Sequence, residues 1–150
     1  ASLGDSVRAW ELLSIINPLK HSSTPEEVAI YRAEPYVVAA DVYALPPHEG
    51  RGGWTWYTGA AGWMYRLIVE SLLGLSLDVD KLRFTPCLPA DWKSFYLHYR
   101  YRETLYNIKV ARAGPGREVV SVTVDGLLQS DGWVHLVDDL EEHLVEIKIA

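Results

Sequence analysis

The sequence contains few of the residues on which several classes of protein depend. It has a single cysteine, Cys87, which excludes an internal disulfide and a cysteine-rich zinc site and fits a reducing compartment. Its 14 Lys and Arg residues form no dense run and are outnumbered by 20 Asp and Glu residues, so we expect no nucleic-acid partner. The apolar runs are too short and too interrupted to span a bilayer, and the N-terminus lacks the pattern of a signal peptide.

Common catalytic motifs are also missing. The sequence has no nucleophile elbow, no P-loop and no dinucleotide-binding fingerprint. No two histidines lie four residues apart, as helical metal ligands do, so we expect no metal site and no cofactor. Phenylalanine is scarce, with 2 residues against 6 Trp and 9 Tyr. Because Trp and Tyr combine an apolar face with a polar edge, this bias predicts aromatic surfaces in contact with water.

The first half of the chain has helical periodicity. Asp5 is a suitable N-cap for a helix that ends before Asn17-Pro18, and Thr24-Pro25 followed by two acids favours a second start. We expect further helices over residues 35–44 and 58–73, the second closed by Gly74.

The second half alternates between apolar and polar residues, which predicts strands. Their regular spacing favours an antiparallel, sandwich-like β domain. The strands are expected over residues 82–84, 95–102, 104–111, 119–124, 133–137 and 144–149.

Residues 50–63, GRGGWTWYTGAAGW, combine five Gly, three Trp and one Tyr just before a helical pattern. One interpretation is a pocket wall, in which aromatic rings hold a sugar while nearby polar groups hold an anion or hydroxyls. The residues of this wall are His48, Arg51, Trp54, Trp56, Tyr57, Thr58 and Gly59. The other interpretation is a glycine-rich connection whose Trp side chains plug a helical core. The residues alone leave both open.

Glu34 and Asp41 form a second candidate pair. A carboxylate at a helix break beside apolar residues can have a raised pKa and act as an acid or base. The alternative is that Glu34 caps a helix starting at Pro35 while Asp41 makes a buried hydrogen bond, and the residues favour this alternative.

Three ordered segments resemble the C-terminal part of family 94 glycoside phosphorylases, which include cellobiose and chitobiose phosphorylases. The segments are EPYVVAADVY (34–43), PHEGRGGWTWYTGAAGWMYR (47–66) and LRFTPCLPADW (82–92). The chain most resembles the phosphorylase-like region of cyclic β-1,2-glucan synthases, over nearly its whole length.

This resemblance implies an (α/α)6 barrel followed by a β domain, with residues 1–75 as the last barrel helices and residues 76–150 as the β domain. It implies inverting phosphorolysis of a β-glycosidic bond, with inorganic phosphate in place of the water and base of an inverting hydrolase. The family's phosphate contacts map onto Thr58 and Gly59. The substrate-binding residues that we expect are His48, Arg51, Trp54, Trp56, Tyr57 and Glu34.

The family's catalytic acid and its phosphate-binding Arg and His lie upstream of these motifs, so we expect this chain to be inactive alone and to hold no catalytic residue. Ala40 stands where the disaccharide phosphorylases tend to carry Gln, which fits a glucan substrate. The implied partners are a β-glucan oligosaccharide, phosphate and the rest of a parent chain, and exposed helix faces predict self-association. The implied parent is a bacterial inner-membrane enzyme, with this region cytoplasmic and involved in controlling glucan length.

Two alternatives of other classes stay open. The chain can be a non-catalytic carbohydrate-binding or structural module that braces the parent barrel. It can also belong to a barrel hydrolase that uses Glu34 as its base, in which case product formation would not depend on phosphate.

Overall fold

The computed structural model describes residue 1, residues 3–56 and residues 59–150. These residues divide into two compact units. We call Val7–Ile68 the helix–hairpin unit, and Ala1–Ser6 together with Val69–Ala150 the β unit. The boundary expected after residue 75 falls within the β unit. Across the described residues, no helix has the length and apolar character that crossing a membrane requires.

The first two predicted helices are confirmed. Helix α1 (Ser6–Ile16) begins directly after Asp5, and Asn17 then caps the short 3-10 helix η1 (Pro18–His21) by accepting a hydrogen bond from Leu19 N. Helix α2 (Pro25–Tyr31) starts with a capping box, in which the Thr24 hydroxyl accepts from Glu27 N and the Glu27 carboxylate accepts from Thr24 N. This exchange satisfies two backbone donors that a helix start leaves unpaired.

The predicted helix over 35–44 is wrong, because this segment is irregular and partly extended. Ala40 N donates to Trp54 O at 2.8 Å, and Tyr43 N donates to Arg51 O at 2.9 Å. Gly53 N donates to Asp41 O at 2.9 Å, so residues 40–43 and 51–54 form an irregular antiparallel hairpin. Val and Tyr, which are frequent in 36–43, lose side-chain freedom in a helix and fit extended backbone better.

The helix predicted over 58–73 is present where the chain is described. It comprises α3 (Ala60–Arg66) and a π-helical continuation, η2 (Leu67–Leu72). Gly74 follows with φ of 77°, a left-handed conformation that suits a helix C-cap.

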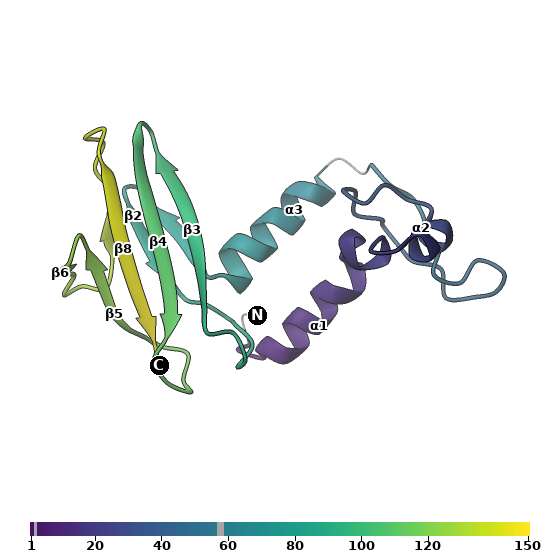
Figure 1. The fold of residues 1–150 in the computed structure, drawn as a ribbon, viewed down its shortest axis with the longest axis horizontal. Coiled ribbons are helices and arrows are strands. Elements are labelled where there is room, and N and C mark those ends of the chain that lie inside the picture. Colours follow the sequence, from purple (N-terminus) through teal and green to yellow (C-terminus); the bar gives the residue numbers. More distant parts are fainter. Residues whose placement is uncertain (2, 57–58) are drawn as a thin grey trace. The chain divides into compact units, whose positions relative to one another are not determined.

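The β unit contains two sheets (Figure 1). The three-stranded sheet has the order β1-β2-β7, formed by Leu75–Asp78, Lys81–Phe84 and Val134–His135. The five-stranded sheet has the order β3-β4-β8-β5-β6, formed by Ser94–Tyr101, Thr104–Arg112, Glu142–Ile149, Val119–Val124 and Leu127–Leu128. The six predicted strands are confirmed with small changes of length, whereas β1 and β6 were not predicted.

The expectation of a purely antiparallel arrangement is wrong at one pairing. Strands β4 and β8 are parallel, from Leu105 opposite Glu142 to Arg112 opposite Ile149. Parallel neighbours need a long connection, and here that connection contains β5, β6 and β7.

The core of the β unit lies on the inner positions of β4 and β8. Tyr106, Ile108, Val110, Val145 and Ile147 are each at most 1% exposed. Burial raises the pKa of the Tyr106 hydroxyl. That hydroxyl donates to Val137 O at 3.2 Å and accepts from Val137 N at 2.7 Å. Because Val137 follows β7, these two bonds connect the five-stranded sheet to the chain leaving the three-stranded sheet.

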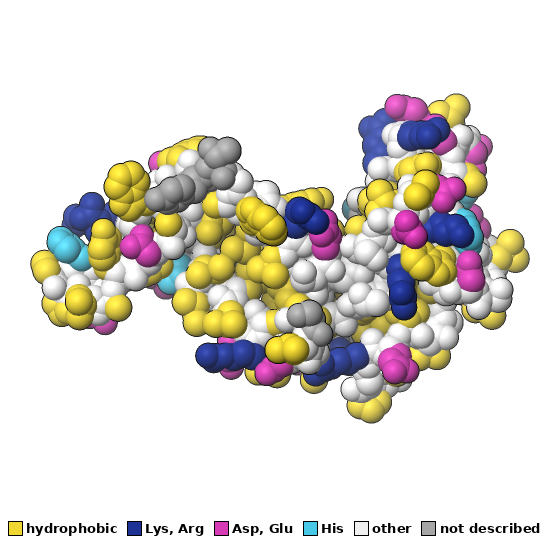
Figure 2. Space-filling view, turned by 180° about the vertical axis from the view of Figure 1, so that it is seen from behind, with side chains coloured by type: hydrophobic (Ala, Val, Ile, Leu, Met, Phe, Trp, Pro, Cys, Tyr) yellow, Lys and Arg dark blue, Asp and Glu magenta, His cyan; other side chains and the backbone are white. Residues whose placement is uncertain are grey.

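The helix–hairpin unit leaves many apolar side chains in contact with solvent. Figure 2 shows hydrophobic side chains gathered over the helices. On α1 and η1 the exposed large apolar residues are Val7, Leu12, Ile15, Ile16 and Leu19. An apolar face of this kind needs a covering partner.

Candidate functional site

Tyr31, at the end of α2, positions the glycine-rich stretch. The side chain is 1% exposed, its ring stacks on His21 with centroids 4.9 Å apart, and burial raises the pKa of its hydroxyl. Its carbonyl oxygen accepts a hydrogen bond from Gly52 N at 2.8 Å. A Cβ at position 52 would lie 3.1 Å from both the Tyr31 ring and Ala33. Gly52 therefore allows the hairpin to lie against this ring.

The neighbouring glycines also accommodate side chains of the protein itself. A Cβ at Gly53 would overlap the Asp41 carboxylate. Gly50 has φ of 80°, which favours glycine, and a Cβ there would lie 2.8 Å from Ile30 Cγ2. The interpretation of a glycine-rich connection thus accounts for these three glycines.

The tryptophans of this stretch do not plug a core, and that part of the same interpretation is wrong. Trp54 is 72% exposed and Trp56 is 66% exposed. The stretch therefore combines two roles, with glycines that face the protein and tryptophans that face solvent.

A pocket of about 490 Å³ lies along the hairpin. It brings together His48, Arg51 and Trp54, three of the predicted site residues. Their neighbours in the pocket wall are Tyr43, Gly52, Gly53 and Thr55. The Tyr43 and His48 rings are 6.0 Å apart between centroids, and both side chains are exposed. The volume and the mixed aromatic and polar lining suit a small ligand such as one or two sugar units.

The sequence predictions missed Tyr43 and Thr55. Tyr43 was assigned to a helix over 35–44, where it would not face Arg51. The β-branched and aromatic composition of 36–43 was the signal that could have identified this edge of the pocket.

A smaller hollow of about 180 Å³ shares His48 and Arg51 and adds Arg32. The two guanidinium groups of Arg32 and Arg51, together with the His48 ring, favour an anion in this hollow, although Glu49 also lines it. His48 and Arg51, the residues predicted to hold an anion or hydroxyls, thus line both hollows.

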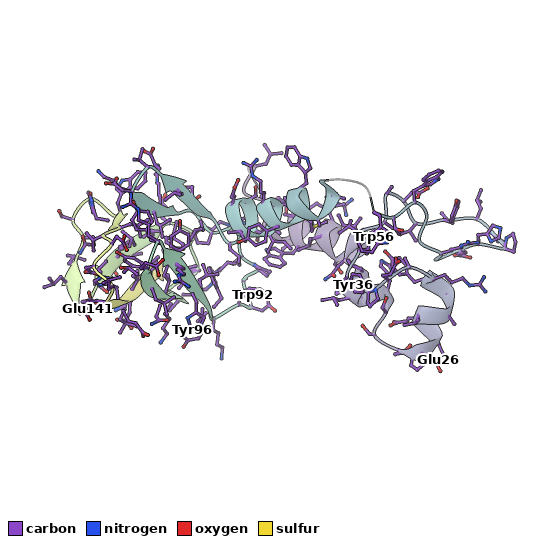
Figure 3. All side chains as sticks on the ribbon, turned by 90° about the horizontal axis from the view of Figure 1, so that it is seen from above. Glu26, Tyr36, Trp56, Trp92, Tyr96 and Glu141 are labelled. Atoms are coloured by element: carbon purple, nitrogen blue, oxygen red, sulfur yellow. The ribbon has the colours of Figure 1, made fainter. Side chains whose placement is uncertain are left out.

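Glu34 and Trp56 are not in the wall of the larger pocket but bind each other. Trp56 Nε1 donates to Glu34 Oε1 at 3.0 Å, and the Trp56 ring meets Tyr36 edge to face at 6.1 Å (Figure 3). The hydrogen bond from Trp56 lowers the pKa of the Glu34 carboxyl. The interpretation in which Glu34 has a raised pKa, which the residues did not favour, is therefore wrong. Glu34 also caps no helix, since none starts at Pro35.

Asp41 lies in the hairpin rather than in a helix, and it is exposed rather than buried. Its carbonyl oxygen accepts from Gly53 N, and its carboxylate lies directly above Gly53. Asp41 thus shapes the hairpin strand that carries Trp54.

Of the two predicted phosphate contacts, Thr58 lies outside the described residues, as does Tyr57, which was predicted to bind substrate. Gly59 has φ of 93° and precedes α3, where its carbonyl oxygen accepts from Trp63 N at 2.8 Å. Within the described ranges, no group of three His, Cys, Asp or Glu side chains is arranged to hold a metal ion.

Comparison with known proteins supports one family. Residues 1–74 match the model of the glycosyl hydrolase 94 superfamily, catalytic domain. The chain is 45% identical to cyclic beta-(1,2)-glucan synthase NdvB of Rhizobium meliloti over 115 aligned residues. The aligned region is 76% of this chain and 4% of the synthase. It is 32% identical over 127 residues to 3-O-beta-D-glucopyranosyl-beta-D-glucuronide phosphorylase of Paenibacillus borealis, covering 82% of this chain and 16% of that enzyme.

A third relative, 1,2-beta-oligoglucan phosphorylase of Listeria innocua, is 24% identical over 135 residues, which are 81% of this chain and 12% of the enzyme. The chain thus spans a small part of each of these relatives. The family-model match contains the helix–hairpin unit and its pocket, and the similarity to the synthase extends over most of the chain. The chain belongs to the glycosyl hydrolase 94 superfamily.

Proposed function

We propose that this chain is part of a cyclic β-1,2-glucan synthase, and that its helix–hairpin unit supplies saccharide and phosphate contacts to a glycoside phosphorylase-type domain. The observation that carries the proposal is the pocket of His48, Arg51 and Trp54, which lies inside the part of the chain matched by the family model. The choice of the β-1,2 linkage is supported by the names of two relatives, a cyclic beta-(1,2)-glucan synthase and a 1,2-beta-oligoglucan phosphorylase.

The pocket has the groups that a sugar needs. Trp54 and Tyr43 offer flat apolar faces for the C–H surface of a pyranose ring, and both are solvent-accessible. Arg51 donates hydrogen bonds, while His48 and Thr55 can donate or accept them. A sugar hydroxyl can therefore find a partner here whether it donates or accepts a hydrogen bond.

Trp56 serves as a second saccharide platform in this proposal. Its positive φ of 63° is unusual for a bulky residue, and the bond to Glu34 fixes the indole edge while the ring stays exposed. Glu34 is then a positioning residue for Trp56 as well as a potential acceptor for a sugar hydroxyl.

Phosphate is proposed to bind at Thr58 and Gly59, with Arg51 and His48 nearby in sequence. The family resemblance supports this assignment, and the left-handed Gly59 before α3 is compatible with a backbone turned toward a ligand. The larger catalytic domain is proposed to be an (α/α)6 barrel, with its acid outside this chain. The parent enzyme is proposed to lie in the inner membrane with this region in the cytoplasm.

The proposed reaction of the parent is inverting phosphorolysis. A phosphate oxygen forms a bond to the anomeric carbon, the β-glycosidic bond breaks, and the leaving oxygen takes a proton from the acid. The products are α-glucose 1-phosphate and a glucan one unit shorter. Removal of one unit per turnover offers a way to control glucan length. Glu34 is poorly suited as the base of a hydrolase, because its lowered pKa makes the carboxylate a weaker base.

The test is release of glucose 1-phosphate from β-1,2-glucan by the full-length parent. Trp54→Ala should lower kcat/KM about 100-fold, because the sugar loses its stacking surface. Tyr96→Ala is the control, since Tyr96 is 66% exposed on the solvent face of β3 and should leave the rate unchanged. Equal rates for the two variants would contradict the saccharide assignment.

A second pair of variants tests the phosphate assignment. Thr58→Val should raise the KM for phosphate at least tenfold, whereas Thr123→Val on β5 should leave it unchanged. An unaltered phosphate dependence in Thr58→Val would remove Thr58 from the site.

The exposed tryptophans also favour a simpler function, a carbohydrate-binding module without turnover. Glucan binding by the parent without glucose 1-phosphate release, at saturating phosphate, would establish this alternative and contradict the phosphorylase proposal.

A further inference from the structure

The β unit has a pocket of its own, larger than the one on the hairpin. Its volume is about 670 Å³. The walls come from the end of β2, residues 85–87, residues 117–119, the loop 131–133 before β7, and residues 1 and 4 near the N-terminus. The family-model match ends at residue 74, so most of this pocket lies outside the matched region.

One wall of this pocket is the Trp133 ring, and contacts with neighbouring residues hold it in place. Trp133 is half-buried, its backbone N–H donates to Asp131 Oδ1 at 3.1 Å, and the Arg83 guanidinium lies 5.6 Å from the centre of its ring. Phe84 and Cys87 in the same pocket are 3% and 6% exposed, so they belong to the core of the unit. A rigid aromatic wall beside a packed floor is preorganised for a flat apolar ligand face.

The charged side chains of this pocket are balanced in sign. Arg83 and Arg117 provide two guanidinium groups, and among the described residues neither forms an ion pair. Asp131 and Glu118 provide two carboxylates. Asp131 Oδ2 lies 2.7 Å from His135 Nε2, and this hydrogen bond lowers the pKa of Asp131, so the carboxylate stays ionised and keeps an acceptor role.

Balanced charge distinguishes between ligand classes. A phosphate or another anion would gain from Arg83 and Arg117 but would be repelled by Asp131 and Glu118. A hydroxyl both donates and accepts hydrogen bonds, so a sugar can use the guanidinium and carboxylate groups together. The Trp133 ring supplies the apolar contact that a pyranose also needs.

We propose that the pocket of Arg83, Arg117, Asp131 and Trp133 is a second saccharide site, which binds a segment of neutral glucan. The choice of β-1,2-glucan as the glucan rests on the proposed function, whereas the site and its preference for a neutral sugar rest on the pocket itself.

The experiment follows indole N–H signals of the 150-residue chain by NMR during titration with linear β-1,2-glucan of about ten units. The Trp133 signal should shift, and it should still shift in Trp54→Ala. Arg83→Met should weaken the Trp133 response about tenfold. Arg100→Met is the control, because Arg100 is exposed on β3, pairs with Glu103 and is not in the pocket wall.

The outcomes separate the two proposals. A Trp133 signal that stays unchanged while Trp54 responds overturns the second site and leaves the proposed function standing. A Trp133 response without any Trp54 response supports the second site and contradicts the hairpin assignment. A Trp133 shift with inorganic phosphate but not with glucan overturns the saccharide assignment. Loss of the Trp133 response in the full-length parent also overturns it, since the pocket would then be closed to glucan in the complete enzyme. Unchanged amide signals of β4 and β8 verify that each variant is folded.

Discussion

The two units of this chain differ in how they bury apolar side chains. Among the described residues, 19 hydrophobic residues are buried, and four of them lie in the helix–hairpin unit: Leu13, Tyr31, Val37 and Ala39. The other fifteen lie in the β unit, most of them on β2, β4 and β8. The β unit thus has a core of its own, whereas the helix–hairpin unit depends on a few contacts around Tyr31. The unit with fewer buried contacts holds the hairpin pocket and the exposed tryptophans, as is common for surfaces that bind ligands.

The largest expected effect lies in the β core. Ile147→Ala should lower the free energy of unfolding of the β unit by about 2 to 5 kcal/mol, because it leaves a cavity between tightly packed strands. Leu144→Ala, on the outer face of the same strand and 57% exposed, should cost less than about 0.5 kcal/mol. Urea unfolding followed by amide signals of β4 and β8 measures both. Similar losses of unfolding free energy in the two variants would contradict the expected difference between core and surface.

In the helix–hairpin unit we expect stability to depend on close contacts of the backbone rather than on a large core. Gly53→Ala should destabilise the hairpin by about 1 to 3 kcal/mol and weaken glucan binding, because the new methyl group displaces the Asp41 carboxylate. Gly62→Ala is the matched control: it lies in α3 with no atom within 4 Å of the new Cβ and should stabilise the helix by about 0.5 to 1 kcal/mol. Hydrogen exchange of the Ala40 and Tyr43 amides reports on the hairpin. Unchanged exchange in Gly53→Ala would show that the close approach is unimportant.

A smaller effect is expected at one end of the five-stranded sheet, where His143 lies between two carboxylates. Its Nδ1 is 2.7 Å from Asp125 Oδ2, its Nε2 is 3.1 Å from Asp139 Oδ2, and its ring stacks on Tyr106. The hydrogen bond to Asp125 raises the pKa of His143, and the bond to His143 lowers the pKa of Asp125. The Glu141 backbone N–H is the main cause that lowers the pKa of Asp139.

The sign of the pH dependence follows from these directions. The His143 contribution is fully present below the unfolded pKa of about 6.5 and is lost as pH rises through the higher folded pKa. The carboxylate contributions are present above about pH 3.9 and are lost as pH falls through the lower folded pKa values. The β unit should therefore be most stable between about pH 4 and 6.5. His143→Gln should remove the decline above this range and cost about 1 to 2 kcal/mol at pH 5.5. An unchanged pH profile in this variant would contradict the assignment.

Self-association is the mildest expected consequence of the difference between the units. The exposed apolar face of α1 should make the isolated chain associate at high concentration. Leu12→Gln with Ile15→Gln should reduce the mass measured by light scattering, whereas Leu144→Gln on β8 should not. A strictly monomeric chain at millimolar concentration would contradict the proposal that this face needs a partner.

The sequence predicted the β unit better than the hairpin, for a physical reason. Alternation along a strand such as β4 is local, and so is the exchange of bonds between Thr24 and Glu27 at the start of α2. The parallel pairing of β4 with β8 joins residues more than thirty positions apart, and no local pattern specifies it. Strand β1 was missed although Leu75 to Asp78 alternate, because four residues after a helix give a weak signal.

The candidate site was predicted in composition but not in arrangement. His48, Arg51 and Trp54 lie close in sequence, so their meeting in one pocket was accessible to prediction. The contribution of Tyr43 depends on pairing between 40–43 and 51–54. The composition of 36–43 favours the extended backbone that this pairing needs, but it does not specify the partner segment. The Trp56 contact with Glu34 spans 22 residues and likewise depends on the fold.

The most direct test of the account is the affinity of this 150-residue chain for linear β-1,2-glucan, measured by calorimetry in three forms. The unaltered chain and Tyr96→Ala should bind with the same dissociation constant, and Trp54→Ala should bind at least tenfold more weakly at the hairpin pocket. Equal affinities in all three forms, or no binding to any of them at millimolar glucan, would contradict the assignment of this pocket as a saccharide site.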